Sequence, residues 1–126
     1  MKNPITTKEI VKNFYDAKSR KSGWQSMVTD RVTFKGTGMP STEGKEALIE
    51  ITEDLLTRLK SAEMKRIIVE GDTALVLNNY HLESPKGNSL ILETAEIVGV
   101  KNGKMDSFDV YFDTAAFQSF IAKLKQ

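Results

Sequence analysis

The chain has 126 residues, which is the usual size of one domain with one hydrophobic core. Its 18 lysines and arginines nearly balance its 17 aspartates and glutamates, so it lacks the basic excess that nucleic acids and anionic membranes attract, and we expect neither partner. It has no cysteine and a single histidine, His81, which excludes disulfides and thiolate chemistry and leads us to expect no metal and no cofactor.

The N-terminal segment is predicted to form a helix. Thr6 and Glu9 have the spacing of a capping box, and Gly23 is expected to end the helix. Apolar residues at helical spacing follow the cap: Val11, Phe14 and Tyr15. This segment lacks the continuous apolar core of a signal peptide, and no stretch of the chain approaches the ~20 apolar residues of a membrane span. We therefore expect a cytoplasmic protein.

The following segments predict a short helix, a strand and a longer helix. Residues 24–28 are expected to form a short helix or turn, and residues 31–36 alternate as a strand does. Ser41 or Thr42 is expected to cap a helix that runs to about Lys60. The buried side of that helix is expected to carry Leu48, Ile51, Leu55, Leu56 and Leu59.

From about Glu63 the apolar pattern changes to a period of two, which is typical of strands. The predicted strands are residues 64–71, 73–84, 88–100 and 104–112, and a final helix is predicted over residues 115–124. Helices packed on an antiparallel meander make an α+β domain, and we expect a single domain over residues 1–126.

Two turns allow the strand register to be predicted. Asn102-Gly103 is a two-residue hairpin signal that pairs Lys101 with Lys104, and hence Ile97 with Phe108. The Pro85-Lys86-Gly87 loop pairs Ser84 with Asn88, and hence Asn79 with Glu93 and His81 with Ile91. Because directly paired residues share a face, one face is predicted to lie against the helices with Leu75, Leu77, Asn79, His81, Ile91, Glu93, Ala95, Ile97, Asp106, Phe108, Val110 and Phe112.

The opposite face is predicted to be exposed in one chain. It is expected to carry Val76, Asn78, Tyr80, Leu82, Leu90, Leu92, Thr94, Glu96, Val98, Ser107, Asp109 and Tyr111. This set is too apolar for a face in contact with water, so we expect a homodimer through the outer side of the sheet. Glu96 is expected to lie there opposite Asp109 as a like-charge pair.

Three stretches resemble the SnoaL-like and ketosteroid-isomerase-like members of the nuclear transport factor 2-like superfamily. They are VKNFYDAKSRKSGWQSMVTDRVTF, STEGKEALIEI and NGKMDSFDVYFD. The resemblance implies a cone-shaped α+β barrel, in which a strongly curved antiparallel sheet wraps around about three N-terminal helices, plus a short C-terminal helix. It also implies a pocket inside the cone and dimers through the outer side of the sheet.

The resemblance does not carry over a particular reaction. Tyr15 is spaced from Trp24 in a similar way to the oxyanion-donating tyrosine of ketosteroid isomerases. Their general base would fall at Lys35, and the inward acid of limonene epoxide hydrolases would fall at Val110. Neither acid is therefore present at its matching position.

Four polar residues are the candidates for chemistry. His81 has an unperturbed pKa near neutrality and is the natural acid–base group, with Glu93 to orient it or to act as a base. Asn79 would donate a hydrogen bond to an oxyanion, and Tyr15 would offer a phenol to a ligand. The competing interpretation is that each is an ordinary hydrogen-bonded residue. The wall of the pocket is expected to consist of Trp24, Phe34, Met39, Met64, Ile91, Phe108, Val110 and Phe112, for most of which core packing is the competing interpretation.

Two functions remain open from the sequence. The first is cofactor-free acid–base chemistry of the isomerase, dehydratase or cyclase type on a small, largely apolar organic ligand. The second is a non-catalytic dimer that binds a ligand or a protein, which the missing acids at Lys35 and Val110 favour.

Overall fold

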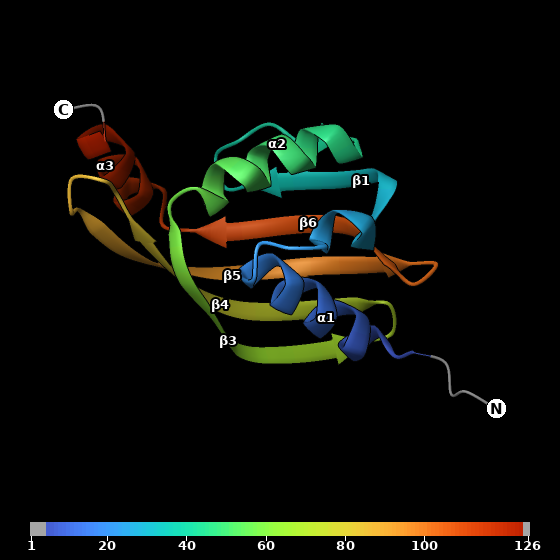
Figure 1. The fold of residues 1–126 in the computed structure, drawn as a ribbon. Coiled ribbons are helices and arrows are strands. Elements are labelled where there is room, and N and C mark those ends of the chain that lie inside the picture. The colour runs from blue at the N-terminus through green and yellow to red at the C-terminus, as the bar shows by residue number, and fades with distance from the viewer. Residues whose placement is uncertain (1–4, 125–126) are drawn as a thin grey trace.

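The computed structural model describes residues 5–124 and shows an α+β fold with three α-helices, one short 3-10 helix and a six-stranded sheet (Figure 1). Its elements in chain order are α1 (Thr7–Ser19), η1 (Trp24–Met27), β1 (Val28–Gly36), β2 (Thr42–Glu43), α2 (Lys45–Leu56), β3 (Leu59–Glu70), β4 (Thr73–Glu83), β5 (Ser89–Lys101), β6 (Lys104–Phe112) and α3 (Thr114–Leu124). The predicted α+β class is therefore confirmed.

Helix α1 begins and ends close to its predicted limits. Thr6 is its N-cap, and its hydroxyl oxygen accepts a hydrogen bond from the backbone N–H of Glu9 at 3.1 Å. The helix ends at Ser19, before Gly23, whose φ of 81° suits glycine and leads into η1. Its buried stripe is the predicted one with two additions: Ile10, Val11, Phe14, Tyr15 and Ala17.

The limits predicted for helix α2 are wrong at both ends. Thr42 pairs with Phe34 of β1, and the helix begins only at Lys45, so neither Ser41 nor Thr42 is its N-cap. Gly44 occupies the N-cap with a φ of 113° and no side-chain hydrogen bond. The helix stops at Leu56, because Leu59 is buried as the first residue of β3 and pairs with Leu82.

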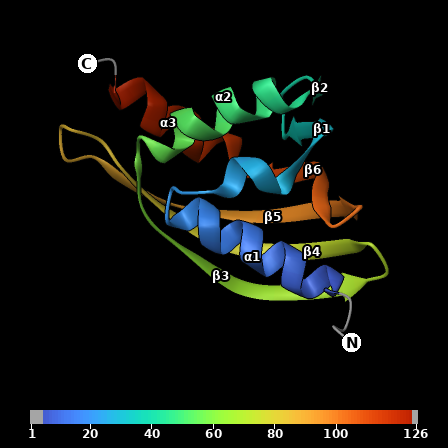
Figure 2. The same ribbon diagram turned by 45° about the vertical axis from the view of Figure 1, so that its right-hand side comes forward.

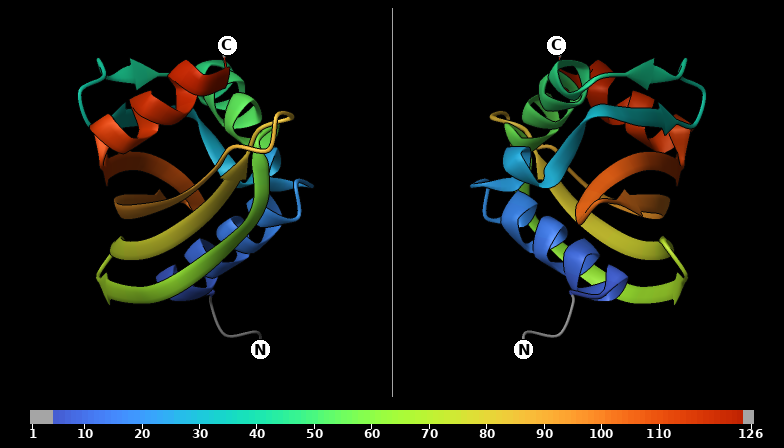
Figure 3. Two further views of the ribbon diagram at one scale, coloured as in Figure 1. Left: turned by 90° about the vertical axis from the view of Figure 1, so that its left-hand side faces the viewer. Right: turned by 90° about the vertical axis from the view of Figure 1, so that its right-hand side faces the viewer.

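The sheet is curved and does not close on itself. Its strand order is β2-β1-β6-β5-β4-β3, with β1 parallel to β6 and the other pairs antiparallel. Strands β3 to β6 bend strongly in both views of Figure 3. Helices α1 and α2 lie over the same face, and α3 lies near the C-terminal end of β6 (Figures 1 and 2). The open edges at β2 and β3 mean that a closed barrel is not formed, and the cone shape stays a prediction.

The register is as predicted in one hairpin and differs in the other. Strands β4 and β5 pair Asn79 with Glu93, which confirms the prediction. Strands β5 and β6 pair Val98, not Ile97, with Phe108. The shift falls between the pairs Val100–Met105 and Gly99–Ser107, so that Asp106 is an extra residue in β6 and forms a bulge.

This single extra residue exchanges the predicted faces of β4 and β5. Phe108, Val110 and Phe112 face the helices as predicted, but their partners on β5 are one residue away from those expected. The helix-facing residues of the two strands are Ala74, Val76, Asn78, Tyr80, Leu82, Leu92, Thr94, Glu96 and Val98, all of which are buried. The predicted inward placement of Leu75, Leu77, Asn79, His81, Ile91, Glu93, Ala95 and Ile97 is therefore wrong, because a one-residue shift turns every side chain of a strand to the other face.

Single cysteines test this orientation, since the natural chain contains none. In the structure Ile97 is 43% exposed and Val98 is fully buried. In chains kept monomeric by dilution, we expect Ile97→Cys to react readily with a soluble thiol reagent, and Val98→Cys to react on the order of a hundredfold more slowly because it must wait for local opening. Equal labelling, or faster labelling at position 98, would contradict the register.

Candidate functional site

A cavity of about 280 Å³ lies between the helices and the inner face of the sheet. Its wall is mainly aromatic and aliphatic, which is typical of a small-molecule site. The lining residues are Phe14, Lys18, Phe34, Met39, Leu48, Ile51, Thr52, Asp54, Leu55, Arg58, Tyr80, Leu92, Thr94, Glu96, Phe108, Val110, Phe112 and Phe117. Four of them carry charge in water, so the cavity combines an apolar wall with a few polar points.

Glu96 is the polar centre of this wall. Its carboxylate is 2% exposed and accepts four hydrogen bonds. Tyr15 Oη donates to Oε1 at 2.7 Å, while Oε2 accepts from Tyr80 Oη at 2.7 Å, Thr94 Oγ1 at 2.8 Å and Asn78 Nδ2 at 2.9 Å. Burial alone would raise the pKa of Glu96, but attraction to Lys18 and these hydrogen bonds outweigh it and lower the pKa. Glu96 therefore stays ionised inside the fold.

Lys18 brings a positive charge to the same cluster from α1. Its Nζ donates to Tyr80 Oη at 3.1 Å and lies 5.4 Å and 4.9 Å from the ring centres of Tyr15 and Tyr80. Burial lowers the pKa of Lys18, although Glu96 opposes this shift. An ammonium group has three N–H donors, and one is used by Tyr80. The other two have no acceptor among residues 5–124, so they can contact a ligand.

Tyr15 and Tyr80 both use their hydroxyl proton in a hydrogen bond to the carboxylate of Glu96. Burial, followed by the nearby negative charge of Glu96, raises the pKa of both Tyr15 and Tyr80 well above the ordinary value. Each hydroxyl has one proton, which it donates to Glu96. The Tyr80 oxygen also accepts from Lys18 and from Asn78. Neither phenol is therefore free to donate to an oxyanion in this arrangement.

A second cavity, of about 220 Å³, lies on the other side of this cluster, between α1 and strands β3 and β4. Lys18 and Tyr80 line both cavities. Its other lining residues are Lys12, Tyr15, Asp16, Ser19, Leu59, Ala62, Met64 and Asn78. The Lys18–Tyr80 contact therefore stands between the two spaces.

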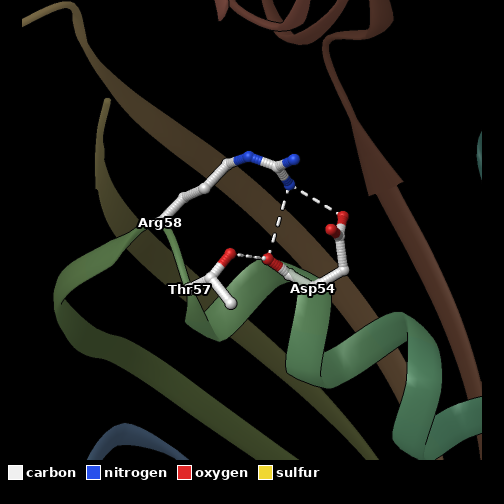
Figure 4. Close-up of polar contacts among 3 residues, drawn as sticks. All are labelled: Asp54, Thr57 and Arg58. Atoms are coloured by element: carbon white, nitrogen blue, oxygen red, sulfur yellow. Dashed lines mark hydrogen bonds and ion pairs between the residues drawn. The ribbon is translucent and has the colours of Figure 1, made fainter. Parts of the chain in front are cut away.

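Asp54 and Arg58 form a polar pair at the C-terminal end of α2 (Figure 4). Arg58 Nη1 donates to Asp54 Oδ2 at 2.7 Å and, more weakly, to the main-chain oxygen of Asp54 at 3.4 Å. Thr57 Oγ1 donates to the same main-chain oxygen at 2.7 Å. Asp54 and Arg58 both line the cavity of about 280 Å³ described first, which is called the main cavity from here on.

The residues predicted for catalysis are not brought together in this cavity. Asn79, His81 and Glu93 lie on the face of the sheet opposite the helices, for the register reason given above, and Ile91 is 53% exposed on that same face. Tyr15 does point to the interior, where it bonds to Glu96. Glu96, expected outside beside Asp109, is instead paired with Val110.

Six of the eight residues predicted for the wall of the pocket line one of these two cavities. Phe34, Met39, Phe108, Val110 and Phe112 line the main cavity. Met64 lines the second cavity, and Trp24 is 1% exposed in the core and lines neither of them.

Lys18, Asn78, Tyr80, Thr94 and Glu96 were missed as a cluster. A signal for them is present in the sequence. Met105 and Phe108 are both apolar but three residues apart, which breaks a strict alternation and indicates the bulge.

Two general features of the described residues bear on function. Within residues 5–124 no three His, Cys, Asp or Glu side chains are grouped so as to hold a metal ion. None of the helices in that range combines the length and apolar character that crossing a bilayer requires.

Replacing the buried carboxylate tests the cluster. Glu96→Gln replaces one accepting oxygen with an NH2 group, which is itself a donor, so at least one of the surrounding donors loses its acceptor. We therefore expect the free energy of unfolding to fall by about 3 kcal/mol. Glu50→Gln, at an exposed glutamate of α2 that lines neither cavity, is the matched control and should change it by no more than about 0.5 kcal/mol. Urea denaturation measures both. Equal effects of the two changes would contradict the cluster.

The pH dependence gives a second measure of the same interaction. The folded-state pKa of Glu96 lies below its ordinary value of 4.5, so its ionised form stabilises the fold fully above that pH. As the pH falls through the folded-state pKa this stabilisation is lost. The stability difference between the natural protein and Glu96→Gln should therefore be constant near neutrality and shrink in acid; an unchanged difference in acid would rule the interaction out.

Comparisons with known proteins agree with this architecture. The SnoaL-like domain model matches residues 11–108. A putative SnoaL-like polyketide cyclase from Jannaschia sp. CCS1 has a TM-score of 0.81 at 17% identity, over 97% of this chain and 96% of that one. An NTF2-like protein of unknown function from Cytophaga hutchinsonii ATCC 33406 has a TM-score of 0.75 at 21% identity, over 94% and 99%. An LEH-like epoxide hydrolase from M. tuberculosis has a TM-score of 0.76 at 14% identity, over 93% and 90%.

A search of curated proteins found no match. At these identities the structural likeness shows the fold, whereas the domain match covers most of the chain. The chain belongs to the SnoaL-like family.

Proposed function

We propose that this protein binds a small, largely apolar organic molecule in the main cavity and moves a proton on it without a cofactor. The observation that carries the proposal is Lys18, whose ammonium lines an apolar, aromatic cavity, has a lowered pKa and makes one hydrogen bond among residues 5–124. A lysine with a lowered pKa has a larger neutral fraction at a given pH, and that neutral amine is a base.

In the proposed reaction Lys18 first accepts a proton from the ligand and then returns one to it. The neutral amine of Lys18 takes a proton from a carbon next to a carbonyl group, which leaves an enolate and an ammonium. The ammonium then returns a proton to another atom of the same molecule, or to the same carbon. No oxidant or reductant is required.

Glu96 would position Lys18 and would not act as the base. Its pKa is lowered, and its two oxygens accept hydrogen bonds from four donors. Such a carboxylate is weakly basic, but its charge holds the Tyr80 hydroxyl that contacts Lys18. The chemistry of the structural relatives, named as a putative polyketide cyclase and an epoxide hydrolase, is compatible with cofactor-free catalysis in this fold.

Carbon-bound hydrogen exchange tests the proposal. We expect the protein to accelerate hydrogen–deuterium exchange at carbon 1 of 2-tetralone, an apolar ketone, as followed by NMR in D2O. Lys18→Met should reduce the protein-dependent rate by on the order of a hundredfold while 2-tetralone still binds. The rate of the natural protein should rise with pH through the pKa of Lys18, which lies below 10.5.

Lys8→Met is the matched control, because Lys8 is an exposed lysine on the same helix and lines neither cavity. Its exchange rate should equal that of the natural protein. Binding of 2-tetralone with no acceleration of exchange would count against catalysis by Lys18.

That outcome would favour the second candidate, a non-catalytic ligand-binding protein. One observation supports this alternative: the described polar groups around Glu96 satisfy one another, so the cluster is explained as a buried network that stabilises the fold.

We also propose that two copies pair through the outer face of the sheet. The residues on that face now differ from those expected, but the face is again too apolar for water: it carries Leu75, Leu77, Ile91, Ala95, Ile97 and Tyr111. The amide oxygen of Asn79 is buried there without a hydrogen-bond partner among the described residues, and a donor from a second copy would satisfy it. The cytoplasmic location remains a prediction.

Sedimentation tests the dimer. We expect the natural chain to sediment at twice its mass of 14.1 kDa, and Leu77→Lys to sediment as a monomer because a charge at the centre of the face would have to be buried. Ile5→Lys introduces the same charge at an apolar residue outside the sheet and should leave the dimer intact. A monomeric natural chain would refute the dimer.

A further inference from the structure

We propose that the ligand of the main cavity carries a carboxylate, and that this carboxylate binds the free edge of the Arg58 guanidinium. This inference rests on the proposed function and names its substrate class: a molecule with one carboxylate on an apolar part about the size of one or two aromatic rings. It assigns a binding role to Arg58, a residue outside the Lys18–Glu96 cluster.

The guanidinium of Arg58 uses one of its three nitrogens. Nη1 makes both contacts to Asp54, and Figure 4 shows that nitrogen turned towards the C-terminal end of α2. Nε and Nη2 have no hydrogen-bond partner among residues 5–124. These two nitrogens form one edge of the planar group, and that edge matches the two oxygens of a carboxylate.

Asp54 does not compete for this edge. Its side chain is 68% exposed, whereas that of Arg58 is 24% exposed, so the acid is in water while much of the arginine is covered. An exposed pair four residues apart on a helix contributes only ~0.5 kcal/mol. Its effect is to orient the guanidinium, because the Nη1 contacts determine which edge remains free.

The rest of the cavity explains why the ligand would be apolar with a single charged end. Phe34, Phe108, Phe112 and Phe117 supply aromatic wall. The ionised Glu96 already accepts four hydrogen bonds from neighbouring side chains and lies near Lys18, so it is poorly placed to attract a cationic ligand. Arg58 follows α2 while Lys18 belongs to α1, so the two cations approach the cavity from separate elements. One would hold the carboxylate and the other would face the reacting part of the ligand.

Calorimetric binding of two matched probes tests the inference. The probes are 2-naphthoate and its neutral amide, 2-naphthamide, with benzoate and benzamide as a smaller pair. We expect the natural protein to bind each acid about tenfold more tightly than its amide, because charge-assisted hydrogen bonds are stronger than neutral ones. In Arg58→Gln this ratio should fall to about one, with the affinity for the amide unchanged, since the apolar contacts remain.

Arg20→Gln is the matched control. Arg20 makes the same four-residue contact, to Asp16 at 3.0 Å, but lines neither cavity, so its ratio should equal that of the natural protein. In Lys18→Met the preference for the acid should persist, because Arg58 is intact.

Three results would overturn the inference: equal affinity for acid and amide in the natural protein, a preference that survives in Arg58→Gln, or a preference that is lost in Lys18→Met alone. Failure of every probe to bind would overturn it together with the ligand-binding cavity. Loss of hydrogen exchange with the acid preference intact would overturn only the proposed proton transfer.

Discussion

The interior of this protein is organised around one buried carboxylate. Glu96 stays ionised among apolar side chains because four donors, from α1, β4 and β5, converge on its two oxygens. An ion without such partners would be too costly to bury. These hydrogen bonds place Tyr15 at one carboxylate oxygen of Glu96 and Tyr80 at the other, and Tyr80 also contacts Lys18. A helix is thereby joined to the sheet by polar contacts at the point where the two cavities meet.

The bulge at Asp106 makes this arrangement compatible with the apolar core. It lets Val98 pair with Phe108 while Val100 pairs with Met105, and three of these four side chains are buried at 5% exposure or less. Without the extra residue the alternation of β5 would oppose that of β6, and either Glu96 or Phe108 would point to the wrong side. Thr29 Oγ1 donates to Asp106 Oδ1 at 2.7 Å, which ties the extra residue to β1.

The main cavity combines an apolar wall with a small number of charged side chains. The aromatic wall favours an apolar body, and its residues come from five elements: α1, β1, β4, β6 and α3. The charged groups are few and come in two sets, one at Glu96 and Lys18 and one at Asp54 and Arg58. In each set the acid helps to orient the cationic side chain, and that side chain has N–H groups without an acceptor in the described part of the chain. An arrangement of this kind suits a ligand with two distinct polar ends.

Local sequence determined the order of the three α-helices and of the longer strands, and the family, although not the limits of α2 or the short strand β2. The capping residue Thr6, the apolar stripe from Val11 to Tyr15 and the two turns before β5 and β6 act over a few residues, and they were predicted correctly. Five of the wall residues were also predicted, since alternation in β6 from Phe108 to Phe112 is local. The polar site was not, because it depends on the register between strands, and one bulged residue reverses the faces of β4 and β5. Only the tertiary structure could decide that Glu96 is inside and His81 outside, because the energy of burying a carboxylate depends on donors contributed by residues up to 81 positions away along the chain.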